Sequence, residues 1–382
     1  MRKVRLLLLL SVMVILSGCW DENEPERMLY INAIGIDFKD GKYEIYAQMI
    51  HFTNIAKSNQ PISDIPQAEV GFATGETVDE AIFELYRSID EMVYWGHLNY
   101  IIVSEETLKN SALSPVIDLF IRNRETRYQI WVYSTKDPIQ DVLLVRPVLN
   151  KGVTFSKLGD PKNAYEQESF IQPMDMRRII IDMNEPSHEA MIPYIKVVEN
   201  WKSVAESIEA PELAGVGVAT PNGFKGFIEG EDVRGMQWMS KDTKGGQITF
   251  KSSHGEFITV NVENVKVDVQ PAVQSGKVSF DIEVELMTTV SVIKGKVSVD
   301  EIQRGIIEQA EKEIKNTYEV ALNSDIDIYR LSEHLYRKNV KAWKQHHIDG
   351  KVALNEDSIR LKVKVAKLES LRKSYTETID SK

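Results

Sequence analysis

The sequence predicts an α+β protein with several domains, built from antiparallel or mixed β-sheets that are each flanked by α-helices. Short segments in which apolar and polar residues alternate recur along the chain, and this period of two is typical of half-buried strands. Amphipathic helical segments lie between them. A chain of 382 residues usually divides into two or three domains, because single cores stop growing at about this size. Tight-turn signals between strands favour this class over a doubly wound parallel sheet.

The first predicted elements form a β-hairpin. Residues 30–36 and 43–50 are rich in β-branched and aromatic side chains, and Asp40-Gly41 between them is typical of a tight turn. Two further strands are expected over residues 99–103 and 129–133.

Two helices are predicted in the same half of the chain. Residues 77–80 (Thr-Val-Asp-Glu) fit a capping box that opens the first helix. Ser114 and Pro115 fit the N-cap and the first turn of the second. The side chains expected to point inward are Val78, Ala81, Ile82, Leu85, Ile89 and Val93 in the first helix, and Ile117, Phe120 and Ile121 in the second.

The second half of the chain carries a strong strand signal. The alternation over residues 257–269 changes phase near Asn264, which indicates a β-bulge. Residues 298–301 (Ser-Val-Asp-Glu) fit a second capping box at the start of a long helix, and more helix is expected over residues 327–346.

Two strands near the C-terminus carry opposite charges on their outward faces. Strand 278–286 is acidic on that face and strand 359–365 is basic. If the two strands are neighbours, the rows complement each other. The residues concerned are Asp281, Glu283 and Glu285 in one strand and Arg360, Lys362 and Lys364 in the other.

The domain division follows from a polar stretch over residues 201–211 that ends at Pro211. We expect a lipoprotein signal peptide over residues 1–18 and an N-terminal α+β domain over 19–205. A small middle α+β unit over 206–255 and a C-terminal α+β domain over 256–375 follow.

The first residues have the features of a secretory signal peptide. Arg2, Lys3 and Arg5 precede an apolar run over residues 6–16. As a helix this run would span only about 16 Å, well short of the roughly 30 Å hydrocarbon core of a bilayer, so it is not a transmembrane helix.

A cleavage motif follows the apolar run. Leu16, Ser17 and Gly18 lead directly to Cys19, an order that resembles the lipobox of bacterial lipoproteins, in which the cysteine is acylated and the chain is cut before it. Cys19 is the only cysteine in the chain, so it has no disulfide partner within the protein. We therefore predict Cys19 as the lipid attachment site, with an ordinary secretory signal as the alternative.

Net charge limits the partners. The formal net charge is −11, and removal of residues 1–18 would take away three positive charges and leave −14. An acidic surface argues against nucleic acid and against broad adhesion to anionic lipid. Residues 20–27 could extend about 26 Å as a tether between the lipid and the folded body.

Catalytic motifs are missing from the sequence. The lone cysteine is assigned to lipid, and there is no H-E-x-x-H, G-x-S-x-G or G-x-x-x-x-G-K pattern. We therefore predict no catalytic residue, no cofactor and no metal.

A few weaker patterns have structural explanations. We interpret His346 and His347 as a solvated helix end and not a metal site, and Asp325 and Asp327 as turn and cap residues and not a calcium site. Glu105 and Glu106 are interpreted as acids at a helix start, and Arg122, Arg124 and Arg127 as charges at a helix C-terminus and not an anion site. Gly215 and Gly217 are interpreted as part of a strand that passes close to a helix.

Seven short landmarks occur in order along the chain. They are Gly18-Cys19-Trp20-Asp21, Ala33-Ile-Gly-Ile-Asp37, Phe120-Ile-Arg-Asn-Arg-Glu-Thr-Arg127, Leu213-Ala-Gly-Val-Gly-Val-Ala219, Leu322-Asn-Ser-Asp325, Leu335-Tyr-Arg-Lys338 and Trp343-Lys344. Together they resemble the Ger(x)C family, the C subunits of spore germinant receptors. One departure is the segment after Asp325, Ile326-Asp-Ile-Tyr-Arg330, where the family often has an aromatic and glycine-containing stretch.

The resemblance implies a lipoprotein on the outer face of the inner membrane of a dormant spore. It implies two integral membrane subunits as partners in a nutrient-sensing complex, and several domains with a sheet and helices each. No catalytic residue is carried over, and only Cys19 transfers, as the lipid site. The alternatives are a lipid-anchored solute-binding protein with a small ligand in an interdomain cleft, and a surface enzyme.

Overall fold

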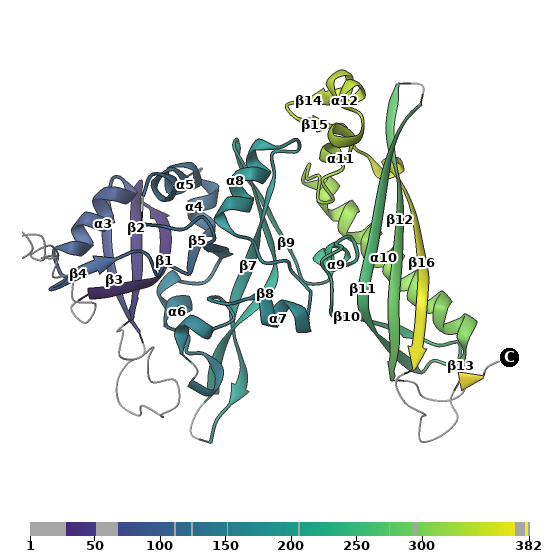
Figure 1. Cartoon of the computed structure of the whole chain (residues 1–382), viewed down its shortest axis with the longest axis horizontal. Helices are drawn as coiled ribbons and strands as arrows, with labels where there is room; N and C mark the ends of the chain where they lie inside the picture. The colour runs from purple at the N-terminus through teal and green to yellow at the C-terminus, as the bar shows by residue number, and fades with distance from the viewer. Residues whose placement is uncertain are drawn as a thin grey trace, which may run out of the picture.

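A computed structural model describes residues 28–50, 68–110, 112–123, 125–150, 152–204, 207–274, 276–292, 297–370 and 379–380. Within these ranges the chain forms a nine-stranded sheet and a four-stranded sheet that stand side by side, each with helices packed against it (Figure 1). The predicted α+β class with several mixed sheets is confirmed.

The nine-stranded sheet is mixed. Its order is β3-β2-β1-β5-β6-β7-β8-β9, with β4 also paired to β1. Strands β1, β5, β6 and β7 run parallel, and the outer strands pair antiparallel. The strands are β1 (Met28–Lys39), β2 (Lys42–Ile50), β3 (Glu69–Gly75), β4 (Met92–Tyr94), β5 (Tyr100–Ser104), β6 (Trp131–Thr135), β7 (Ala190–Lys202), β8 (Ser207–Thr220) and β9 (Gly223–Glu229).

Helices cover both faces of this sheet, which is why the central strand β5 is buried along its whole length. Apolar side chains of α3, α5 and α8 pack on one face, and those of α6 pack on the other. The helices are α3 (Val78–Tyr86), α4 (Glu105–Lys109), α5 (Leu113–Arg122), α6 (Ile139–Leu144), α7 (Lys162–Gln167) and α8 (Met176–Asn184).

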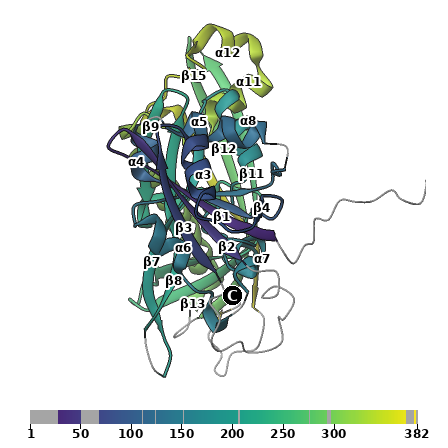
Figure 2. The same cartoon turned by 90° about the vertical axis from the view of Figure 1, so that its left-hand side faces the viewer.

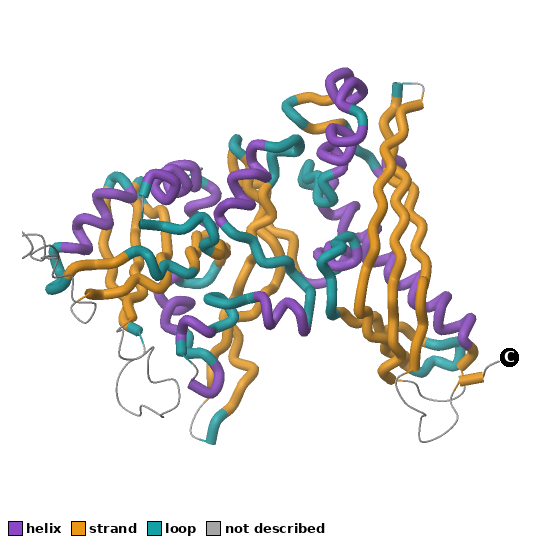
Figure 3. Tube along the Cα trace, in the orientation of Figure 1, coloured by secondary structure: helices purple, strands orange, loops and turns teal. Residues whose placement is uncertain are grey.

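The four-stranded sheet has the order β10-β11-β12-β16, and the long helix α10 lies along it (Figure 3). Ile306 and Ile314 of α10 share a core with β11 and β12, and Val216 and Ile228 of the first sheet join the same core. The elements are β10 (Gly246–Lys251), β11 (Phe257–Gln274), β12 (Lys277–Val292), β16 (Ile359–Ser370), α9 (Gly235–Trp238), α10 (Val299–Asn323), α11 (Leu331–Lys338), α12 (Val340–His346), and the short strands β13 (Val297–Ser298), β14 (His347–Ile348), β15 (Lys351–Val352) and β17 (Ile379–Asp380).

Several local predictions are confirmed. The first hairpin turns at Asp40 and Gly41, both with positive φ, as a tight turn between twisted strands requires. The register of β11 shifts between Val262 and Asn264, at the predicted bulge. The Ser298 side chain accepts a hydrogen bond from the Glu301 N–H and so caps α10.

Two helix predictions were wrong in extent. The first helix ends at Tyr86, because the residues that follow turn back and form strand β4, in which Val93 pairs with Leu29 of β1. Strand pairing therefore overrides the helical period there. The second helix begins at Leu113, so Ser114 does not cap it, and Ile121 is 38% exposed.

Helix is present over most of the predicted range 327–346, as α11 and α12, which are separated at Asn339; it begins at Leu331. One further expectation needs correction. Gly215 approaches a strand and not a helix: a Cβ there would lie 2.1 Å from the backbone oxygen of Ile228 in β9.

The acidic and basic rows lie on neighbouring strands, which is the condition under which they complement each other. Strands β12 and β16 are parallel neighbours, with Asp281 opposite Arg360. Arg360 donates to both carboxylate oxygens of Asp281, and Lys364 pairs with Glu283. Both side chains of the Arg360–Asp281 pair are about half exposed, so water screens the attraction.

We therefore expect Arg360→Ala to change the melting temperature by no more than about 2 °C. Thermal unfolding followed by circular dichroism measures this. A drop of about 5 °C or more would mean that the pair stabilises the sheet edge more strongly than solvent-exposed pairs do.

The predicted boundary at 205/206 falls between β7 and β8, on residues outside the described ranges, and Pro211 lies within β8, opposite Val197. Strands on both sides of the boundary thus belong to one sheet. The division into domains at the proposed residues stays a prediction.

Candidate functional site: a charged junction between the two sheets

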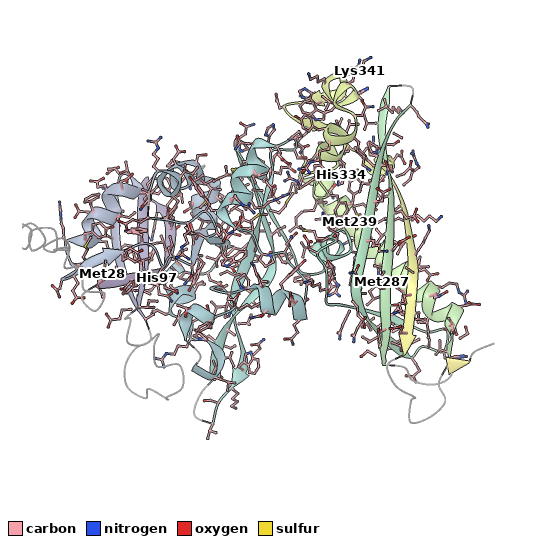
Figure 4. The ribbon with its side chains drawn as sticks, in the orientation of Figure 1. Met28, His97, Met239, Met287, His334 and Lys341 are labelled. Atoms are coloured by element: carbon pink, nitrogen blue, oxygen red, sulfur yellow. The ribbon has the colours of Figure 1, made fainter. Side chains whose placement is uncertain are left out.

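The predicted lipid site, Cys19, and the cleavage motif Leu16, Ser17 and Gly18 lie outside the described residues. The lipid attachment therefore stays a prediction. The first described residue, Met28, opens β1 at one end of the molecule, where Figure 4 shows it beside His97.

A cluster of charged residues joins α8 of the first sheet to the segment around α11, which follows α10. We call it the junction. It lies in the region of Figure 4 around His334, which belongs to α11. Its members are Asp182, Glu185, Ser187 and Glu189 on one side, and Asp325, Asp327, Arg330, Glu333, Arg337 and Lys351 on the other.

Arg330 is the centre of the junction. Its guanidinium donates to the backbone oxygen of Glu189 at 2.9 Å and to Glu333 Oε2 at 2.5 Å. Its Nη1 also lies 3.2 Å from Asp182 Oδ1. The Arg330 side chain is 15% exposed, and its backbone has the left-handed φ of 53°. Such a conformation is unfavourable for a residue with a side chain, so the surrounding contacts must hold it.

Burial and neighbouring charge act on the carboxyl groups in opposite directions. Burial raises the pKa of Asp182 even though the charges of Arg330 and Arg178 oppose the rise. Burial likewise raises the pKa of Glu189, against the effect of its partner Lys351. For Glu333 the surrounding arginines outweigh burial, and its pKa is lowered. The junction is therefore a buried set of paired charges.

A second set of hydrogen bonds crosses the junction beside Arg330. The buried carboxylate of Asp327 accepts from the Ser187 hydroxyl at 2.8 Å and from the backbone N–H groups of Leu331 and Ser332 at the start of α11. The Asp327 N–H donates in turn to Glu189 Oε2 at 2.8 Å. The Asp327 carboxylate thus caps α11 and also holds the loop after α8 that carries Ser187.

Gly350 also takes part in the contact between the two sides of the junction. Its backbone oxygen accepts from the Ser187 N–H at 3.2 Å, and its φ is +86°. A Cβ at this position would lie 2.4 Å from the His188 ring, so both the conformation and the space require glycine.

The other residues singled out in the sequence lie as follows. Asp325 and Asp327 both reach the junction, where Asp325 pairs with Lys225 and Lys351. Glu105 and Glu106 begin α4 as expected. His347 stacks on Trp343 at the end of α12. Arg124 lies outside the described residues. In the described part of the chain, no three His, Cys, Asp or Glu side chains are placed to hold a metal ion.

The junction itself was not predicted, although the sequence contains a signal for it. Asp182 follows Met176 and Ile179 on the buried side of α8, so a carboxylate lies in an apolar stripe. A buried carboxylate requires a cationic partner. Helical spacing identifies Arg178, which pairs with Asp182 at 2.8 Å, but it cannot identify Arg330, which comes from another part of the chain.

A cavity of about 620 Å³ lies between α7 and the second sheet. Polar groups around it pair with each other, as Lys244 does with Glu166 and Gln247 with Asn261. Another cavity, of about 370 Å³, lies beside α6 and includes Arg146 and Lys157. Across the described residues, no helix is long and apolar enough to cross a bilayer.

The fold and the junction define a class of protein: a multi-domain α+β body whose two sheets are held together by shared apolar core and buried ion pairs. Two family descriptions match it in order. "Spore germination protein N-terminal domain" matches residues 21–197, and "Spore germination B3/ GerAC like, C-terminal" matches residues 214–366. The chain belongs to the Ger(x)C family, and it is a germinant receptor subunit involved in spore germination.

Individual relatives agree with this assignment. Spore germination protein KC of Bacillus subtilis is 22% identical over 89% of this chain and 88% of its own. Spore germination protein B3 of the same organism is 24% identical over 72% of this chain and 71% of its own. The crystal structure of the GerBC protein shares the fold, with a TM-score of 0.55 and 19% identity over 89% of this chain and 97% of that one.

Proposed function

We propose that this chain is the lipid-anchored, non-enzymatic subunit of a germinant receptor complex. It is held at the outer face of the spore inner membrane by lipid on Cys19, and it acts through contacts with two integral membrane subunits. The observation that carries the proposal is the position of the family match, which begins at residue 21, two residues after Cys19. A short acidic tether then separates the lipid from the first strand.

The arrangement of charges supports a contact role. Asp182, Glu189 and Glu333 of the junction are paired with arginine or lysine side chains. Asp327 instead accepts hydrogen bonds from Ser187 and from the start of α11. These contacts hold the two sheets together. A protein whose parts are joined by packed and hydrogen-bonded contacts can transmit a change at one end to the other end.

The proposal predicts retention at the membrane through Cys19. We expect the intact lipoprotein to co-purify, from spore inner membranes in mild detergent, with two polytopic membrane proteins. Cys19→Ala should leave the membrane fraction and lose or weaken the germination response. Ser17→Ala is the matched control, because alanine is also small and the lipid-bearing cysteine remains.

Two outcomes would overturn the proposal. One is a lipoprotein that is isolated without membrane partners, and the other is its absence from spores. Thermal stabilisation of the protein by amino acids or sugars would then favour the solute-binding alternative, with the cavity of about 620 Å³ as the first place to look.

A further inference from the structure

The start of β1 and its neighbours form an exposed edge with an unusual composition. We call it the tether edge and define it by Met28, Met92, Tyr94, His97, Arg127 and Tyr128. Met28 lies opposite Met92 in the β1–β4 pair, and Tyr30 lies opposite Tyr94. Figure 2 shows the start of β1 and strand β4 together on the right-hand side of the first sheet.

Ring contacts hold this edge together. Tyr94 packs edge-on against Tyr30 and His97, with centroids 5.8 Å apart in each case. The loop that carries Arg127 is fixed beside it, because Glu125 accepts a hydrogen bond from the Trp95 N–H at 3.4 Å. Burial lowers the pKa of His97, and the charge of Arg127 lowers it further, so the imidazole is neutral at pH 7.

The edge exposes apolar and aromatic surface to solvent. Met92 is 59% exposed, Tyr128 is 53% exposed and Tyr94 is 37% exposed. Tyrosine side chains, which combine an apolar ring with a polar hydroxyl, are enriched at the boundary between water and lipid, and the exposed methionine adds apolar surface beside them. Phe83, on the neighbouring helix α3, is also exposed.

Cationic side chains accompany the aromatic ones. Arg127 and Arg177 are exposed, and neither forms an ion pair with any residue that the structure describes. Arg177 is adjacent to Tyr128, because the backbone N–H of Arg177 donates to the backbone oxygen of Tyr128. Asp90 and Glu91 precede Met92 and are exposed as well, so the edge is mixed in charge. The whole chain carries a net charge of −11, which makes exposed, unpaired arginines here locally distinctive.

The tether decides which surface can meet the membrane. From Cys19 to Met28 the chain can span at most about 30 Å. A globular chain of this length has a radius of gyration of about 21 Å, so its body is wider than the tether is long. The end of the molecule that carries Met28 must therefore stay close to the bilayer, and this is the end with the exposed aromatic and cationic side chains.

We propose that the tether edge rests on the outer surface of the bilayer, with Met92, Tyr94 and Tyr128 in the headgroup region and Arg127 and Arg177 against lipid phosphates. This inference rests on the proposed lipid anchor and adds an orientation to it. The acidic remainder of the body faces away from an anionic surface, because like charges repel.

The test uses the intact lipoprotein in vesicles of phosphatidylcholine and phosphatidylglycerol. Its one natural cysteine carries the lipid, so a cysteine placed elsewhere can be labelled alone. Met92→Cys places a polarity-sensitive fluorophore on the tether edge. Ile348→Cys is the matched control, because Ile348 is 75% exposed and lies on β14, far from β1 in Figure 1.

We expect the fluorophore at position 92 to shift to the blue and to lose intensity when lipids with a nitroxide quencher are added, and the one at position 348 to do neither. Arg127→Glu should reduce the quenching at position 92. If the protein floats with the vesicles but neither fluorophore is quenched, the orientation is wrong and the lipid anchor stands. If the protein does not float with the vesicles, the anchor itself fails.

Discussion

Replacement of Arg330 by alanine is expected to destabilise the protein by about 3–5 kcal/mol, because it removes the buried cation that two buried carboxylates share. Asp182 and Glu333 keep only the half-exposed Arg178 and Arg337. The Glu189 backbone oxygen also loses a donor. Urea unfolding followed by circular dichroism measures the loss as a lower midpoint.

Arg337→Ala is the matched control for this prediction. Arg337 pairs with Glu185 and Glu333 in the same cluster, but its side chain is 58% exposed. Water can solvate the carboxylates on that side, so the expected loss is about 1 kcal/mol or less. Equal losses for the two variants would contradict a buried junction.

The Arg330→Ala defect should also depend on pH. Without the arginine, the pKa of Asp182 in the folded state rises further above its value in the unfolded chain. The cost of that charge is then present above the folded-state pKa and fades as the pH falls towards the unfolded value. The difference in free energy of unfolding between the variant and the unchanged protein should therefore be smaller at about pH 5 than at pH 7. A difference that grows on acidification would exclude this explanation.

Local patterns in the sequence predicted local structure well. Alternation placed β11 and β12, the Asn264 bulge is a change of phase, and Ser298 caps α10 because a hydroxyl three residues before a glutamate satisfies a free N–H. The complementary charge rows fit the observed β12–β16 pair, although they did not by themselves predict it. These features are decided by neighbours in the chain or by the two faces of one strand.

Features that depend on distant segments were not predictable in the same way. The helical period continued past Tyr86, but β4 formed there because β1 offered an unpaired edge. Asp182 and Glu313 lie in the apolar stripes of α8 and α10. Each has one partner four residues away on its own helix, and another partner from a distant part of the chain. Sequence patterns can identify such a buried charge and its neighbour on the helix, but only the fold identifies the distant partner.

Replacement of Trp238 by alanine is expected to lower the free energy of unfolding as much as replacement of Arg330 does. Its side chain is fully buried, and its Nε1 donates to Glu313 Oε2 of α10 at 2.5 Å. It lies in α9, within the segment that leads from β9 of the first sheet to β10 of the second. Trp238→Ala should therefore cost about 3–5 kcal/mol and loosen the connection between the two sheets.

Trp238→Phe separates packing from hydrogen bonding at this connection. It keeps a large ring in the core but leaves Glu313 with Gln309 and Arg234 alone, so we expect a smaller loss of about 1–3 kcal/mol. If Glu313→Leu is combined with it, the two losses should not add, because each change removes the same hydrogen bond. Additive losses would show that packing alone holds α9 on α10. Non-additive losses would mean that one buried hydrogen bond fixes the link between the two sheets.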